Sequence, residues 1–79
     1  MRVVYEERTD VVTIYFLSER TQVTSELVDE DIILDFAEGG RLAAIEIIGA
    51  SERLDLAVLK KLTYEVDTSP PIRMELPQR

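Results

Sequence analysis

The chain has 79 residues, no cysteine and no histidine, and its 16 acidic and 9 basic residues give a formal net charge of −7. This composition excludes disulfides, zinc sites built from Cys and His, and catalytic pairs in which a histidine activates a nucleophile. The acidic balance repels polyanions, so we expect neither nucleic acid nor a membrane surface as a partner.

The length accommodates one domain, and a domain this small buries too little surface to be stable without some supplement. The apolar runs are too short to cross a membrane, and the N-terminus turns acidic too early for a secretory signal peptide. We therefore expect a cytoplasmic protein that is stabilised by association with another chain.

The first predicted elements are β-strands. Residues 3–5 and 11–17 are rich in Val, Ile and aromatic side chains, and the polar residues 6–10 between them suit a connecting loop. These runs predict an opening hairpin. Residues 21–28 alternate apolar and polar side chains more weakly, so we expect a half-exposed strand that ends at the acidic, solvated turn of residues 29–31.

The strongest strand signals are at residues 32–36 and 42–48. Both runs are rich in β-branched and other large apolar side chains. Gly39 and Gly40 between them adopt the positive φ of a tight hairpin turn at little steric cost. The sequence therefore predicts a second hairpin.

The register of this hairpin follows from its hydrophobic pattern. We expect Phe36 opposite Arg41, because a slip by one residue would move Glu46 onto the buried face. One face is then almost wholly apolar, with Ile32, Leu34, Phe36, Ala43, Ile45 and Ile47. The other face carries Ile33, Asp35, Leu42, Ala44, Glu46 and Ile48.

From Ser51 onward the apolar period becomes that of a helix. Ser51 is a suitable N-cap, and Glu52 follows it in the first turn, where the helix dipole favours an acid. Lys60 and Lys61 lie where the dipole favours a cation. We expect one helix over residues 52–62, and the stripe expected on the sheet consists of Leu54, Ala57, Val58 and Leu62.

The end of the domain is predicted soon after this helix. Residues 63–66 suit an edge strand, and Pro70 and Pro71 stop regular structure because proline lacks the backbone donor. The chain therefore divides into a single α+β domain, residues 1–66, and a Pro-containing C-terminal tail, residues 67–79.

The order of these features resembles a small bacterial family catalogued as domain of unknown function two-two-eight-three. The resemblance covers roughly the first two-thirds of the chain. This sequence departs from the family at Thr13, where an aromatic is frequent, at Ala44, where Gly is common, and at residues 6–9, which lack the usual Asp-Pro opening. The resemblance implies an antiparallel sheet with a helix, no established activity and no catalytic residues. The matching positions are Tyr5, Asp10, Ile14, Val28, Leu34, Asp35, Phe36, Gly40, Leu42, Ile45, Glu46, Ile47, Ala50 and Ser51.

Asp35 and Glu46 are the one pair of residues with candidate chemistry. In the predicted register they lie on the same face of neighbouring strands. Two carboxylates at that separation can share a proton or bind a hard cation such as Mg²⁺ or Ca²⁺. The interpretation that we favour is the polar face of a half-solvated hairpin. We predict no catalytic residue, no metal site, no cofactor and no enzyme activity.

The sequence as a whole predicts an α+β fold, an antiparallel β-meander of four to five strands with one helix packed on a face. One sheet face and one helix stripe then cover each other. Uncovered apolar side chains usually mark an interface, so we expect a non-enzymatic protein-interaction module that acts as a homodimer or binds another protein. The alternatives are an antitoxin-like neutraliser of a basic protein and a metal-binding protein that uses Asp35 and Glu46. The candidate interface residues are Ile33, Leu42, Ile48, Leu56 and Leu59.

Overall fold

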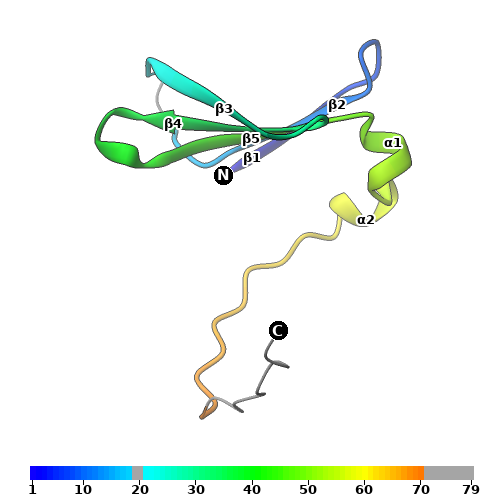
Figure 1. Ribbon diagram of the computed structural model, residues 1–79. Helices are drawn as coiled ribbons and strands as arrows, with labels where there is room; N and C mark the ends of the chain where they lie inside the picture. Colours follow the sequence, from blue (N-terminus) through cyan, green and yellow to red (C-terminus); the bar gives the residue numbers. More distant parts are fainter. Residues whose placement is uncertain (19–20, 71–79) are drawn as a thin grey trace, which may run out of the picture.

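The computed structural model describes residues 1–18 and 21–70. In this part of the chain, five strands form one antiparallel sheet, and short helices follow the last strand (Figure 1). The strands are β1 (Arg2–Glu6), β2 (Val11–Tyr15), β3 (Val23–Asp29), β4 (Ile32–Ala37) and β5 (Leu42–Ile48). The helical segments are η1 (Glu38–Gly40), α1 (Ala50–Arg53) and α2 (Leu56–Leu59). The predicted α+β class is confirmed.

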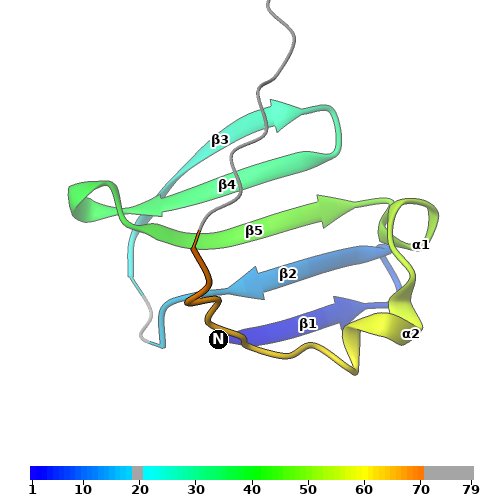
Figure 2. The same cartoon turned by 90° about the horizontal axis from the view of Figure 1, so that it is seen from below.

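The strand order in the sheet is β1-β2-β5-β4-β3 (Figure 2). β1 and β2 form the predicted opening hairpin, and β3, β4 and β5 form a meander whose last strand pairs with β2. β2, β5 and β4 are therefore interior strands, while β1 and β3 are the two edges. The five strands predicted before residue 49 are all present, although β2 ends at Tyr15 rather than at residue 17.

The register of the β4–β5 hairpin differs from the prediction. Leu34 pairs with Ile45, two residues beyond the predicted partner, and an irregularity then brings Phe36 opposite Leu42. The predicted pairing of Phe36 with Arg41 is wrong because the connection is longer than assumed: η1 occupies it, and the backbone N–H of Ala37 donates to the Arg41 carbonyl at 2.8 Å. A shift of two residues keeps side chains on their predicted faces.

The two faces of the sheet differ in composition. One face, which we call the apolar face, has two rows of cross-strand neighbours from β1, β2, β5 and β4. These rows are Val3, Ile14, Ile45 and Leu34, then Tyr5, Val12, Ile47 and Ile32. The opposite side, which we call the mixed face, carries polar and apolar side chains together, among them Thr13, Ser25, Ile33, Asp35, Ala44, Glu46 and Ile48.

The single helix predicted over residues 52–62 is divided into α1 and α2. Leu54 is extended, with φ −126° and ψ 147°, and the Asp55 carboxylate accepts a hydrogen bond from the Ala57 N–H at 3.2 Å. Asp55 thus caps a new helix instead of continuing the first. Gly49, with φ 66°, precedes α1, so the prediction that Ser51 is the N-cap is wrong.

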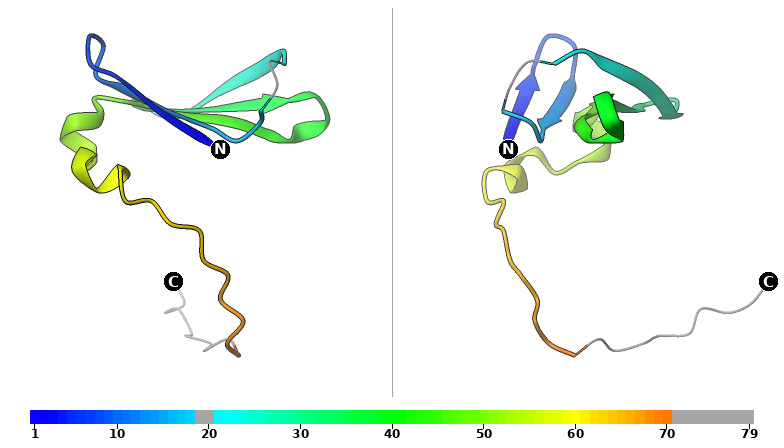
Figure 3. Two further views of the ribbon diagram at one scale, coloured as in Figure 1. Left: turned by 180° about the vertical axis from the view of Figure 1, so that it is seen from behind. Right: turned by 90° about the vertical axis from the view of Figure 1, so that its left-hand side faces the viewer.

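Both helices lie at one end of the sheet, on the side of the apolar face (Figures 1 and 2). Leu56 and Leu59 of α2 line a groove with Val3 and Tyr5 of β1. Beyond α2, residues 63–66 are not a strand, contrary to the prediction, and the chain up to residue 70 runs away from the sheet (Figure 3). Most of the predicted tail, residues 71–79, lies outside the described residues.

The buried core is small. Among the described residues, Val12 and Ala50 have no exposed surface, and the other buried apolar residues are all alanines: Ala37, Ala43 and Ala44. None of the helices in the described ranges is long and apolar enough to span a membrane. A core with so few large side chains contributes little of the hydrophobic free energy that a domain needs.

Candidate functional site

Asp10 holds the first hairpin against the start of α1. It lies in the β1–β2 turn with a positive φ of 55°. Its carboxylate accepts hydrogen bonds from the Tyr5 hydroxyl at 2.8 Å, the Ser51 N–H at 3.0 Å and the Ser51 hydroxyl at 2.7 Å. Its backbone carbonyl accepts the Ala50 N–H at 2.9 Å. We call Tyr5, Asp10 and Ser51 the Asp10 cluster.

The electrostatics of the Asp10 cluster favour a structural role. Hydrogen bonds from Ser51 and Tyr5 lower the pKa of the Asp10 carboxyl, and the same contact with Asp10 raises the pKa of the Tyr5 hydroxyl. A carboxylate with a lowered pKa is a weak base, so it does not activate the Ser51 hydroxyl that it binds. The cluster stabilises the junction between the hairpin and α1.

The structure brings Asp35 and Glu46 together, as predicted. Asp35 of β4 is opposite Ala44, and Glu46 of β5 is opposite Ile33, so the two acids are diagonal neighbours on the mixed face. Asp35 is only 7% exposed. The Ser25 hydroxyl of β3 donates a hydrogen bond of 2.6 Å to the Asp35 carboxylate. Neighbouring strands therefore supply all three members of this polar group.

Glu46 holds a proton more tightly than a glutamate in water. A hydrogen bond with Asp35, burial and repulsion by the Asp35 charge together raise the pKa of Glu46 to about 6. The protonated Glu46 carboxyl can donate a hydrogen bond to Asp35, so the pair shares a proton below that pH.

The surroundings of this pair favour a shared proton over a bound cation. Residues 1–18 and 21–70 contain no group of three or more His, Cys, Asp or Glu side chains placed to hold a metal ion. Calcium takes roughly six to eight oxygen ligands, and magnesium requires near-octahedral geometry. Asp35 and Glu46 with the Ser25 hydroxyl supply only a fraction of either set.

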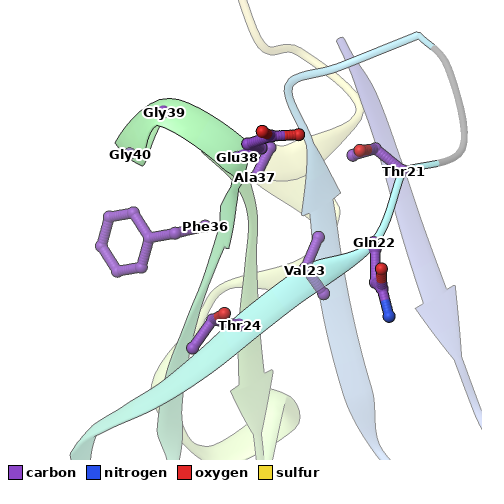
Figure 4. A pocket seen from close by; sticks show the side chains of 9 residues that line it. All are labelled: Thr21, Gln22, Val23, Thr24, Phe36, Ala37, Glu38, Gly39 and Gly40. Atoms are coloured by element: carbon purple, nitrogen blue, oxygen red, sulfur yellow. The ribbon is translucent and has the colours of Figure 1, made fainter.

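Two hollows in the sheet surface lie where a ligand could bind. The hollow beside Asp35 is also lined by Arg2 and Tyr15, but the Arg2 guanidinium stacks over the Tyr15 ring at 4.6 Å, and Ser25 already binds Asp35. Figure 4 shows a second hollow next to η1, in which the side chains spread apart rather than point toward one centre. Neither hollow assembles the converging polar groups of a ligand site.

The five predicted interface residues do not form one patch. Ile33 and Ile48 lie on the mixed face, and Leu42 is opposite Phe36 close to η1. Leu56 and Leu59 line the groove against β1, on the side of the apolar face. All five are half-buried. They are divided between the two sides of the sheet, as the predicted faces imply, because α2 lies on the side opposite to Ile33 and Ile48.

The open apolar face and the Asp10 cluster were not predicted from the sequence. Leu34 and Ile45 were expected beneath the helix but are only half-buried. Asp55, a good helix N-cap in the middle of the expected helix, was the signal for the break. The Asp10 cluster joins residues 41 apart in the chain, and its only signal was that all its members are among the positions that carry the family resemblance.

The model of a family described as protein of unknown function (DUF2283) matches residues 2–51. The matched range begins at β1 and ends at Ser51, so it includes the Asp10 cluster and the Asp35–Glu46 pair. No curated protein and no solved structure matches the chain.

Proposed function

We propose that this chain, which belongs to the DUF2283 family of proteins of unknown function, is a non-enzymatic interaction module that forms a homodimer through its apolar face. The proposal concerns a surface rather than a reaction, because the Asp10 cluster and the Asp35–Glu46 pair are accounted for as structural groups. The proposed interface differs from the one predicted from sequence, which consisted of Ile33, Leu42, Ile48, Leu56 and Leu59.

The observation that supports the proposal is the exposure of Ile45. Ile45 is in β5, an interior strand, and has Ile14 and Leu34 as apolar neighbours on both sides. A residue in this position is normally buried when a second layer covers the sheet, yet Ile45 is half-buried. Since α1 and α2 lie only at the end of the sheet that holds the β1–β2 and β3–β4 turns, the centre of the face lacks a second layer.

The size of the face suits a dimer. With four strands about 4.8 Å apart and a rise of about 3.3 Å per residue, the face measures on the order of 19 by 20 Å, or roughly 400 Å² if flat. Side chains make the accessible area larger than the flat area, which brings it toward the roughly 800 Å² per partner of a standard interface.

The charge distribution favours a second copy as the occupant. A net charge of −7 on each chain opposes self-association unless the contact buries no charge. The two rows of the apolar face contain no ionisable group other than the Tyr5 hydroxyl, which is bound to Asp10. Glu26 and Asp29 of β3 lie at the rim, where solvent remains. Two such faces can pack as a two-fold symmetric sandwich with the sheets about 10 Å apart.

Sedimentation equilibrium on two matched variants tests this proposal. The native chain should sediment with twice the chain mass, and Ile45→Lys should weaken the dimer by at least about a hundredfold, because it places an unpaired charge in the interface. The control, Ile33→Lys, makes the same change on the mixed face and should leave the mass dimeric. A native chain of monomer mass, or dissociation by Ile33→Lys alone, contradicts the proposal.

A milder variant, Ile45→Thr, tests the same position if Ile45→Lys does not fold. Ile45→Thr keeps a β-branched side chain that suits a strand but adds a hydroxyl to the apolar face. It should retain the far-ultraviolet circular dichroism of the native chain and weaken the dimer by about tenfold or more, since burying an unpaired hydroxyl costs ~1–3 kcal/mol. An unchanged dissociation constant in a folded Ile45→Thr variant would also count against the apolar face.

A further inference from the structure

Residues 61–66, which we call the arm, have the pattern of a strand without a partner. Leu62, Tyr64 and Val66 alternate with polar residues, so an extended arm is apolar on one side. In the structure these side chains are 48%, 89% and 67% exposed. An extended segment with three exposed large apolar side chains has a surface suited to pairing with a sheet edge.

The outer edge of β1 is complementary to the arm. An antiparallel alignment with Tyr64 opposite Val3 also places Leu62 opposite Tyr5, so the arm extends the apolar face by one strand. This alignment puts Glu65 opposite Arg2 and Lys61 opposite Glu6, and opposite charges on directly facing residues stabilise a strand pair. The pattern of side chains and the pattern of charges thus select the same register.

The other edge of the sheet lacks this complementarity. β3 contains the acidic residues Glu26 and Asp29 and no basic residue. Glu65 would therefore meet no cation on β3, and like charges facing each other destabilise a strand pair. β1 is the better acceptor of the two edges.

The course of the chain assigns the arm to a second copy. After α2 the arm leaves its own sheet on the side of the apolar face, which is where the second sheet lies in the proposed homodimer (Figures 1 and 3). We infer that residues 61–66 of each copy add as a sixth strand to β1 of the other copy, so that the two chains exchange arms. This inference rests on the proposed homodimer and adds contact area to it.

Disulfide trapping tests the exchange, and the chain contains no cysteine that would interfere. Directly opposite residues of an antiparallel pair have Cα atoms about 4.5–5.5 Å apart, which suits a disulfide. Mixing the Val3→Cys and Tyr64→Cys variants under mild oxidation should give a covalent dimer joined through positions 3 and 64, identified by peptide mass. The control mixture, Val4→Cys with Tyr64→Cys, points the two thiols to opposite faces and should give at least about tenfold less product.

The outcomes separate this inference from the proposed function. A dimeric mass without the 3–64 disulfide overturns the arm exchange and leaves the homodimer in place, whereas a monomeric native chain overturns both. A disulfide that forms only within one chain of the Val3→Cys/Tyr64→Cys double variant shows that the arm pairs with its own β1, which also overturns the exchange. If Val3→Cys does not fold, Arg2→Cys with Glu65→Cys tests the same register at exposed positions.

Discussion

Asp10 and Glu46 illustrate how opposite surroundings change the acidity of two carboxyl groups in one small sheet. Asp10 receives hydrogen bonds from two hydroxyl groups and one backbone N–H, which stabilise its charge. Glu46 lies beside another carboxylate and is partly buried, which penalises its charge. Changes at the two residues should therefore affect stability in opposite directions at neutral pH.

Replacing Asp10 should destabilise the fold at neutral pH. Asp10→Ala removes both carboxylate oxygens that accept the hydrogen bonds of the Asp10 cluster, whereas Asp10→Asn keeps one oxygen and tolerates the positive φ, so the melting temperature should fall more for Ala than for Asn. The pKa of Asp10 is lowered from 3.8, so its charge stabilises the fold above that pH and stops doing so as the pH falls through the folded-state value. Thermal unfolding at pH 7 and near pH 2 measures both effects, and equal losses for Asp10→Asn at the two pH values would contradict the electrostatic part.

Replacing Glu46 by Gln should stabilise the fold at neutral pH. The pKa of Glu46 is raised from 4.5 to about 6, so its contribution is full below pH 4.5 and is lost as the pH rises through 6. The loss should be about 1 kcal/mol, since a pKa unit corresponds to about 1.36 kcal/mol and solvent reduces the effect at a partly exposed site.

The measurement for Glu46→Gln is denaturant unfolding from pH 4.5 to 7.5. The variant should exceed the native chain in stability at pH 7.5, and the difference should shrink toward pH 4.5. Glu38→Gln, an exposed change outside the Asp35–Glu46 pair, is the control for the altered net charge. A native chain whose stability relative to Glu46→Gln does not change with pH would show that the carboxyls do not interact.

At the scale of the elements, local patterns were sufficient for the strands but not for the helix. The β-branched runs and the Gly39–Gly40 turn predict four strands and two hairpins, and alternation placed Asp35 and Glu46 on one face even though the register was shifted by two residues. The helix prediction counted apolar positions alone and gave no weight to Asp55, whose carboxylate begins a new helix.

The position of the helices on the sheet depends on contacts between residues that are distant in the chain. No local sequence pattern specifies these contacts. The displacement of α1 to the end of the sheet is accompanied by the hydrogen bonds between Asp10 and Ser51, 41 residues apart. The Arg53 side chain adds ion pairs to Asp29 and Asp31 at 3.5 and 3.1 Å, which also hold α1 near the β3–β4 turn. The solvated turn at residues 29–31 was predicted, but its pairing with Arg53 was not.

The whole molecule combines a small core with a large open face. Val12 is the one large side chain fully buried in the described residues, while the centre of the apolar face remains in contact with solvent. Most of the large apolar side chains of a single copy are therefore only half-buried. Covering this face would supply the hydrophobic free energy that a single copy lacks. Folding and association should consequently be coupled.

This coupling predicts that the melting temperature depends on protein concentration. If the dimer dissociates when it unfolds, a higher protein concentration favours the folded dimer by mass action. The melting temperature should then rise by about 5 °C for each tenfold increase in concentration, given an unfolding enthalpy of about 0.7 kcal/mol per residue. Ile33→Lys should show the same slope, because its charge lies on the mixed face. Ile45→Lys should melt at a lower temperature that does not change with concentration, since it unfolds as a monomer. Calorimetry over a hundredfold range of about 1–100 µM measures the slope, and a constant melting temperature for the native chain would mean that a single copy is stable with its apolar face open.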